Sequence, residues 1–461
     1  MKSDKEKKEA FGKEPLPKLL RDQAIPAAVG MLVMSIYGII DTIFVGRWVG
    51  TAGIGAITVV QPIVYLIASL GMALGIGGAS LISRSFGENN DEKANLTFNN
   101  QVILNLGSGM IVLLLCFLFN EQILMIFGGR QELAEPSKAY FNIVLLGIPC
   151  LSWAIMSNNI MRSLGHPKTA MFTLLIPAVL NLILDPVFIV GFDMGIEGAA
   201  WATSISYMSS AIFTVYFFVF KQEQLTISFR KLRLNWSITK EIMGIGSVTL
   251  SRQGIISILS ILLNNTLFMI GGTVGVSAYG IISRMLMFAN FPTIGITQGF
   301  VPILGYNYGA KLKERVDELI KLSMKWATII AILTFALIMV LAPQITALFT
   351  KDKELIAATV PAMRYVFMAT PLIAINLIGS AYFQAIGKSL PALLLAMTKQ
   401  GFFLIPILLI LPRFVGINGI WFAFPIADTG AAIITFWYIY KKVLSKNKIE
   451  SEDEPINHLV K

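Results

Sequence analysis

Long apolar runs separated by short polar turns recur along the whole chain. A helix needs about 20 apolar residues to cross a hydrocarbon core about 30 Å thick. Because lipid offers the backbone no hydrogen-bond partner, each crossing must be helical. The pattern predicts twelve membrane-spanning helices, over residues 23–47, 55–83, 97–120, 137–161, 169–191, 196–220, 241–270, 277–306, 322–343, 358–386, 391–412 and 416–440.

The composition agrees with this pattern. Of 461 residues, 55% are hydrophobic and 14% are charged, and the mean hydropathy is +0.70, whereas a soluble domain carries about 25% charged residues. We therefore expect an all-α integral membrane protein. The polar N-terminus lacks the short apolar core and the cleavage site of a signal peptide, and Cys116 and Cys150 give no disulfide framework.

The basic residues divide unevenly between the two sides of the membrane. Twelve crossings put both termini on one side, and that side carries most of the 37 Lys and Arg residues. The other side carries only Arg47, Arg130, Lys138, Lys351, Lys353 and Arg413. By the positive-inside rule, both termini of this multi-pass plasma-membrane protein are cytoplasmic. Topology and contact with anionic lipid then account for the net charge of +10 without a nucleic-acid partner.

The chain contains the same pattern twice. The segment "DTIFVGRWVGTAG" at 41–53 resembles "NTLFMIGGTVGVS" at 265–277, and Gly87 and Gly309 are 222 residues apart at the ends of similar helices. An even number of crossings per half gives a parallel repeat, a common architecture of transporters. We expect two pseudo-symmetric six-helix lobes over 23–220 and 241–441, an N-terminal segment over 1–22, a linker over 221–240 and a tail over 442–461.

Two carboxylates interrupt apolar helices of the first half. Asp41 lies in the middle of the first crossing, and Asp185 lies in the fifth, with Asn181 one turn earlier on the same helix face. An ionised carboxylate at the bilayer centre costs about 2.5–3.5 kcal/mol, so such an acid predicts function. The second half has Asn265 and Pro406 at the corresponding positions, which indicates one chemical site in the first lobe. Two nearby carboxylates in a low dielectric would share a proton or bind a small cation.

The charged residues within the membrane also have structural interpretations. The two acids could instead pair with basic side chains or cap a helix break. Arg252, Arg284 and Lys399 come from the other half and could be such partners, or they could reach lipid headgroups by snorkelling. Asp428 follows Pro425 in the last crossing, where its carboxylate could satisfy a kink.

Several uncharged residues are candidates for the neighbourhood of the acids. Each could join two helices through a hydrogen bond, worth about 0.6 kcal/mol, or could contact a ligand. These residues are Tyr37, one turn before Asp41, and Asn158, Asn159 and Thr203. Pro26 removes a backbone hydrogen bond and makes the start of the first crossing easy to bend.

Together with longer motifs, these residues resemble the MATE family, the multidrug and toxic compound extrusion transporters. The resemblance covers nearly the whole chain and is carried by "IPAAVGMLVMSIYGIIDTIFVGR", "SRSFGENNDEKA", "NNIMRSLGHPKTAM", "LNLILDPVFIVGFDMGIEGAAWAT", "KQGFFLIP" and "PIAD". Because the seventh and eighth crossings carry no acids, the chain resembles the DinF-like branch. The resemblance implies two six-helix lobes that form a V around a central cavity. It also implies a cation site made of Asp41, Asn181, Asp185 and Thr203, with Tyr37, Tyr140 and Asn158 near it.

The predicted function is cation-coupled antiport, driven by H⁺ or Na⁺, by a monomer without a cofactor. The resemblance implies that the exported substrates are amphiphilic, often cationic, drugs. An alternative from the same superfamily is a lipid-linked oligosaccharide flippase, in which Arg252, Arg284 and Lys399 would contact a pyrophosphate. We do not expect a membrane-embedded enzyme, because His166 and His458 lie outside the crossings and no nucleophile lies beside a base.

Overall fold

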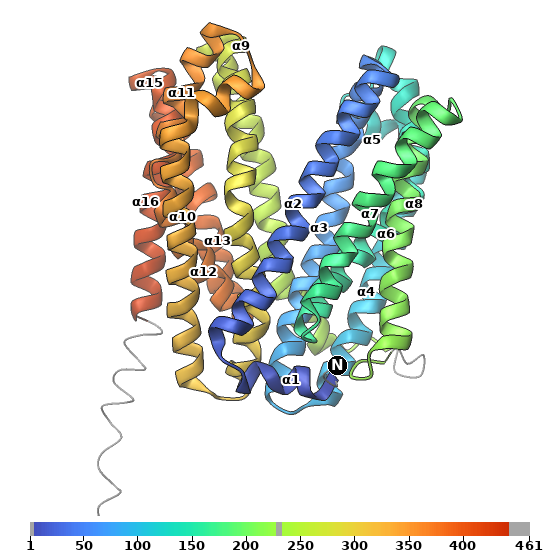
Figure 1. Cartoon of the computed structure of the whole chain (residues 1–461), viewed down its shortest axis with the longest axis vertical. Helices are drawn as coiled ribbons and strands as arrows, with labels where there is room; N and C mark the ends of the chain where they lie inside the picture. The colour runs from blue at the N-terminus through green and yellow to red at the C-terminus, as the bar shows by residue number, and fades with distance from the viewer. Residues whose placement is uncertain (1–3, 227–232, 442–461) are drawn as a thin grey trace, which may run out of the picture. The chain divides into compact units, whose positions relative to one another are not determined.

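The computed structural model describes residues 4–226 and 233–441, and the elements in these ranges are helices (Figure 1). Up to residue 221 they are α1 (Asp4–Lys13), α2 (Leu16–Trp48), α3 (Thr51–Gly87), α4 (Asp91–Leu118), α5 (Asn120–Ile126), η1 (Gln131–Leu133), α6 (Ala134–Ser163), α7 (Pro167–Asp185), η2 (Pro186–Gly191), α8 (Gly195–Tyr216) and η3 (Phe217–Lys221). They continue with α9 (Trp236–Gly309), α10 (Lys313–Phe349), α11 (Lys353–Phe367), η5 (Thr370–Leu372), α12 (Ile373–Ala385), α13 (Ser389–Met397), η6 (Thr398–Leu404), α14 (Ile405–Ile410), α15 (Pro412–Val415) and α16 (Ile417–Ile439). The predicted tail over 442–461 and part of the predicted linker lie outside the described residues.

The long element α9 contains two membrane crossings. Its 74 residues would extend about 110 Å as one straight helix at 1.5 Å per residue, which is far more than the thickness of a bilayer. Gly272 has φ 57° and ψ −151°, a conformation that is essentially restricted to glycine, and it separates the expected crossings 241–270 and 277–306. The described residues contain 11 apolar spans, and because α9 counts twice, they provide the twelve crossings that the sequence predicts.

The N-terminal segment differs from the sequence-based expectation. Residues that we expected to form a polar extension form the separate helix α1, and α2 begins at Leu16 rather than at residue 23. Ion pairs one helical turn apart, Lys13 with Glu9 and Lys18 with Glu14, favour helix in this polar sequence. Because the pattern search was for apolar runs, it could not detect a short helix of mostly charged residues.

The tenth crossing also differs from its expected form, which was one helix over 358–386. The structure divides it into α11 and α12, which are joined by the short 3₁₀ segment η5. Pro371 lies within η5, and its ring nitrogen cannot donate the hydrogen bond that would continue an α-helix. This crossing is therefore a broken helix.

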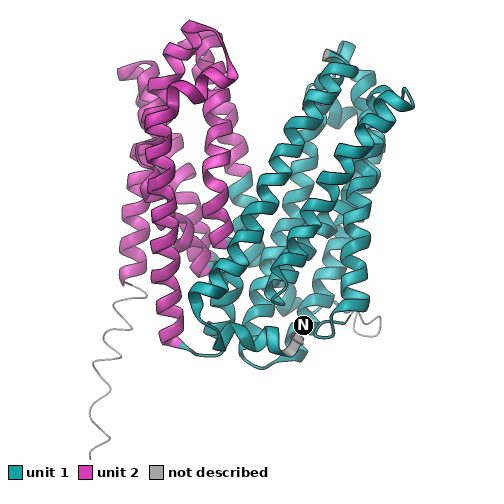
Figure 2. Ribbon diagram, viewed as in Figure 1, with its two compact units in different colours: residues 1–253, 298–312, 384–389 teal, residues 254–297, 313–383, 390–461 magenta. Residues whose placement is uncertain are grey.

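The structure divides into two compact units (Figure 2). Unit 1 contains the chain up to residue 253 together with 298–312 and 384–389, and unit 2 contains the remainder. In unit 1 the core lies among α3, α6 and α8, where Phe141, Val144 and Ile148 are almost completely buried. The core of unit 2 includes residues of α9, α11 and α16.

Large apolar side chains are also exposed on the outside of the helices. On α4, Met110, Ile111, Leu114 and Phe117 are exposed by 66%, 61%, 55% and 74%. An apolar outer surface of this kind is incompatible with water and is typical of a helix that faces lipid.

Candidate cation site in unit 1

A change of helix type marks the position of the second acid. Asp185 is the last residue of α7, and the wider π-helical segment η2 begins at Pro186. Proline has no N–H group to donate to the carbonyl group of Leu182, so the hydrogen-bond ladder is interrupted here. Short π-helical segments are frequent at functional sites.

Asn181 connects polar groups from two helices. Its Nδ2 atom lies 3.4 Å from Asp185 Oδ1 and 3.4 Å from Thr203 Oγ1 on α8. These three side chains are exposed by only 1%, 3% and 5%, respectively. An amide, a carboxyl and a hydroxyl group therefore meet at one buried position within the predicted membrane region.

Asp41 reaches the same position from α2. Its carboxyl group is within hydrogen-bonding reach of the carboxyl group of Asp185. Although Asp41 Oδ1 and Asn181 Oδ1 are buried, no group in the described residues donates a hydrogen bond to either atom. The ion pairs in the described part of the chain include neither acid, so the pairing with basic residues that we considered from the sequence is not found there.

Three tyrosines surround this acid cluster. The Tyr140 side chain of α6 interacts with the Thr203 hydroxyl group, and Tyr37 of α2 interacts with Tyr207 of α8 through their hydroxyl groups. Our sequence reasoning missed Tyr207. Its signal was its spacing of four residues from Thr203, which puts both side chains on one face of α8.

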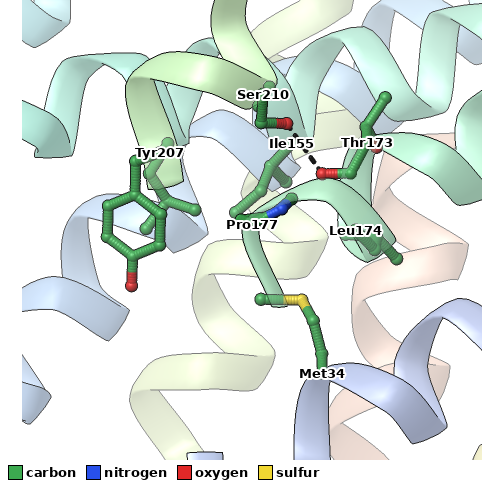
Figure 3. Close-up of a pocket in the computed structure, with 9 residues that line it drawn as sticks. Met34, Ile155, Thr173, Leu174, Pro177, Tyr207 and Ser210 are labelled. Carbon is green, nitrogen blue, oxygen red and sulfur yellow. Dashed lines mark hydrogen bonds between the residues drawn. The ribbon is translucent and has the colours of Figure 1, made fainter. Parts of the chain in front are cut away.

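A small pocket lies next to Tyr207 (Figure 3). It encloses about 240 Å³ of empty space between α2, α6, α7 and α8, and its lining includes Met34, Thr173 and Pro177. The Ser210 hydroxyl group on α8 donates a hydrogen bond of 2.7 Å to the Thr173 carbonyl oxygen on α7. Because Met34 belongs to α2, the lining of this pocket depends on the position of the helix that carries Asp41.

Asn158 joins helices. Its Nδ2 atom lies 2.5 Å from the Ala170 carbonyl oxygen and 2.8 Å from Thr173 Oγ1, and its Oδ1 atom accepts a hydrogen bond of 3.2 Å from Arg162 Nε. These bonds connect α6 to the first turns of α7. The neighbouring Asn159 donates to the Ile155 carbonyl oxygen of its own helix at 3.0 Å.

Pro26 lies at a distance from the acid cluster. It is buried in α2, fifteen residues before Asp41, which corresponds to about 22 Å along a helix. The structure therefore does not place Pro26 beside the carboxyl groups.

Two of the four charged candidates in the second half form an ion pair. Lys399 Nζ on η6 lies 2.6 Å from Asp428 Oδ1 on α16, and these side chains are exposed by 21% and 3%. Arg284 is exposed on α9, and Arg252 is partly buried on the same element. The buried acid of unit 2 thus has a basic partner, in contrast to the two acids of unit 1.

Twelve apolar crossings in two repeated halves, with acids buried in one half only, define a membrane transporter. The chain belongs to the MatE family, because the family model matches residues 26–187 and 252–410. One matched segment lies in each half, in agreement with the repeat that the sequence predicts. The protein is therefore a transporter and not an enzyme.

Similar proteins extend over nearly the whole chain. The multidrug export protein MepA of Staphylococcus aureus (strain NCTC 8325 / PS 47) is 26% identical over 431 residues, which are 93% of this chain and 95% of MepA. MepA of Staphylococcus saprophyticus is 28% identical with the same coverage. A crystal structure of MATE in the bent conformation matches with a TM-score of 0.90 at 25% identity, over 96% of this chain and 99% of that one. MATE in the straight conformation matches with a TM-score of 0.89 at 26% identity, over 95% and 98% of the two chains.

Proposed function

We propose that this protein exports amphiphilic, often cationic, drugs or toxic compounds across the plasma membrane in exchange for H⁺ or Na⁺. It acts as a monomer surrounded by lipid, with both termini in the cytoplasm. The similarity to multidrug export proteins over 93% of the chain supports the substrate class. The observation that carries the coupling is the contact between Asp41 and Asp185, for which the described residues provide no basic partner.

The acid cluster needs a positive charge that can leave. Two carboxylates in contact and away from water repel each other unless they share a proton or bind a cation. A proton would bridge the two carboxyl groups, whereas Na⁺ would also use the oxygen atoms of Asn181 and Thr203. In both cases the positive charge comes from solution, so the site can alternate between a filled and an empty state.

This alternation acts on the contact between α2 and α7. With the cation bound, the attraction between Asp41 and Asp185 holds the two helices together, and after its release the repulsion separates them. Movement of α2 would also displace Met34 and change the pocket beside Tyr207. A membrane potential provides about 2.3 kcal/mol per charge for each 100 mV, which is enough to drive export against a gradient.

The flippase alternative receives less support. It requires free positive charge to bind a pyrophosphate, but Lys399 is paired with Asp428. Replacing Arg252 and Arg284 by Gln and measuring both drug resistance and the pool of lipid-linked sugars would distinguish the two functions.

The coupling can be tested in proteoliposomes that contain the purified full-length protein. Uptake of a cationic dye is measured with a pH gradient alone and with a Na⁺ gradient alone, for the wild type, Asp41→Asn and Asp185→Asn. We expect at least one gradient to drive uptake by the wild type. Because neither variant retains the carboxyl pair, both should lose at least about tenfold in gradient-driven rate, an effect of about 1.4 kcal/mol or more.

Asp193→Asn is the matched control. Asp193 is exposed in the turn between η2 and α8, and its positive φ of 54° is tolerated by Asn as well as by Asp. This variant should transport at the wild-type rate. If Asp41→Asn and Asp185→Asn also transport normally under either gradient, the proposed coupling site is wrong.

A further inference from the structure

In unit 1 the end of α3 packs against the end of α9, backbone to backbone. A Cβ atom built at Gly87 would overlap the Tyr306 carbonyl oxygen, and one built at Gly309 would overlap the backbone of Arg84. Only glycine permits helices to approach so closely. This contact is on the end of the molecule that we predict to be cytoplasmic.

The contact is symmetric with respect to the internal repeat. Arg84 and Tyr306, like Gly87 and Gly309, are 222 residues apart, so each glycine contacts the repeat partner of the residue that the other glycine contacts. Such an exchange of contacts is the signature of a two-fold interface.

Further contacts follow the same rule. Gly77 lies against Gly246, and the corresponding residues Gly299 and Ala24 also lie against each other. Ser83 lies against its own repeat partner Gly305, as expected for residues at the axis. We call this surface, made of residues 77–87, 246 and 299–309 with Ala24, the inner seam.

The symmetry of the inner seam fails at the turns that cover it. Gly387, which has φ +80°, packs against the guanidinium group of Arg84. That group also lies 2.7 Å from Glu241 Oε1 and donates to the Ser80 carbonyl oxygen at 3.3 Å. The repeat partner of Gly387 is Gly165, but the repeat partner of Arg84 is Tyr306, which has no guanidinium group.

Helix α1 fills the position where that second guanidinium group would lie. The backbone of Lys7 packs against Gly165, and Gly12 packs against the Tyr306 ring. The centroids of the Phe11 and Tyr306 rings are 6.0 Å apart. One side of the inner seam is thus covered by a residue of α3 itself, and the other side by a separate helix (Figure 1).

Further contacts hold α1 at the ends of three membrane helices. Phe11 is only 2% exposed, and its carbonyl oxygen accepts a hydrogen bond of 3.0 Å from Asn307 Nδ2. Lys8 forms an ion pair with Asp91 and lies 4.8 Å from the centroid of the Phe86 ring. Lys7 Nζ lies 3.4 Å from His166 Nε2. A helix of ten residues therefore contacts the turns that follow α3, α6 and α9.

We infer that α1 is a detachable latch that holds the inner seam closed and must be released before the cytoplasmic end can open. This inference rests on the proposed export cycle, in which that end opens once per turnover. Arg84 cannot leave the seam without moving α3, whereas α1 is connected to α2 only through residues 14 and 15. Its anchoring is also modest, because Phe11 is its one large apolar side chain in contact with the seam.

The first test measures access to the seam. Ser83→Cys, which is fully buried in the wild type, is introduced after Cys116 and Cys150 have been replaced by Ala. Its labelling by a membrane-impermeant maleimide is followed in inverted vesicles. Phe11→Ala should increase the labelling rate about tenfold, within the range of allosteric couplings. Lys13→Ala is the matched control, since this side chain is 75% exposed, and it should leave the rate unchanged. Equal rates with and without Phe11 would overturn the latch.

The second test fixes α1 in place. Lys8→Cys and Asp91→Cys are joined by a short, reducible reagent with two thiol-reactive groups, in the same cysteine-free background. Cross-linking should reduce drug transport to less than about a tenth of the rate, and reduction of the linker should restore it. The single-cysteine proteins, treated in the same way, should remain active. Full transport by the cross-linked protein would contradict the latch while leaving the proposed function intact, because that function is tested by the Asp41 and Asp185 variants.

Discussion

At the scale of single residues, two threonines on α8 show how position decides a role. Thr203 lies beside Asn181 in the acid cluster. Thr214, three turns later, accepts a hydrogen bond of 2.9 Å from Trp153 Nε1 and donates one of 2.8 Å to the Ala211 carbonyl oxygen. Both hydroxyl groups are buried, but only the first adjoins the carboxyl groups. The first is therefore expected to contribute to coupling and the second to stability.

Replacing each threonine by valine separates these roles. Thr203→Val keeps the shape of the side chain and removes the oxygen, so we expect weaker cation binding. The concentration of the coupling cation at half-maximal transport should rise about fivefold, equivalent to about 1 kcal/mol. Thr214→Val should lower stability by about 1–3 kcal/mol, because it leaves Trp153 Nε1 without its partner, and should not change the cation dependence. If the two variants affect the cation dependence equally, Thr203 is not part of the site.

The residues of the site could be predicted to different extents. Asp41 and Asp185 were evident because a carboxylate inside an apolar run is costly and therefore needs a reason. Asn158 was predicted near the site, but its amide connects α6 to α7. An amide that joins helices and one that lines a site look the same in sequence, because both lie on a buried helix face. Tyr207 was missed because a tyrosine in a membrane helix is not unusual.

At the scale of elements, glycines in left-handed conformations make the sharp turns between crossings. Gly50 and Gly272, which are 222 residues apart, have φ values of +90° and +57°. The repeat therefore preserves both the helices and the strained turn that joins the first crossing to the second. The number of helices followed from apolar run length, but the π-helical segments and η5 depend on local hydrogen bonds that run length does not report.

Gly272→Ala tests the turn within α9. Its φ and ψ are accessible essentially only to glycine, so a Cβ atom should cost about 1–3 kcal/mol. The apparent unfolding temperature of the detergent-solubilised protein should fall. Gly280→Ala is the control in the same element, since its Cβ would meet no atom within 4 Å and alanine favours helix by about 1 kcal/mol. This control should unfold at the wild-type temperature or above it, and an equal decrease for both variants would show that α9 continues as a helix through Gly272.

At the scale of the whole molecule, the repeat explains why a single cation site is expected in a doubled architecture. Unit 1 retains an acid pair with a buried amide, whereas the buried acid of unit 2 is neutralised by Lys399. The sequence predicted the duplication from its constant offset. It did not predict that 298–312 and 384–389 would belong to unit 1, because this depends on close contacts between glycine backbones, which apolar patterning does not show.

The same glycine contacts predict the membrane topology. Gly87 and Gly309 touch, so α3 and α9 end on the same side of the membrane, which requires α9 to cross twice. In a background with Cys116 and Cys150 replaced, single cysteines at Glu88, Lys388 and Lys351, all exposed positions, are labelled with an impermeant maleimide. In intact cells we expect labelling only at Lys351→Cys, and in inverted vesicles at Glu88→Cys and Lys388→Cys, because twelve crossings and the positive-inside rule put these two turns in the cytoplasm. Labelling of Glu88→Cys and Lys388→Cys from opposite sides would mean an odd number of crossings between them, and the assignment of two crossings to α9 would be wrong.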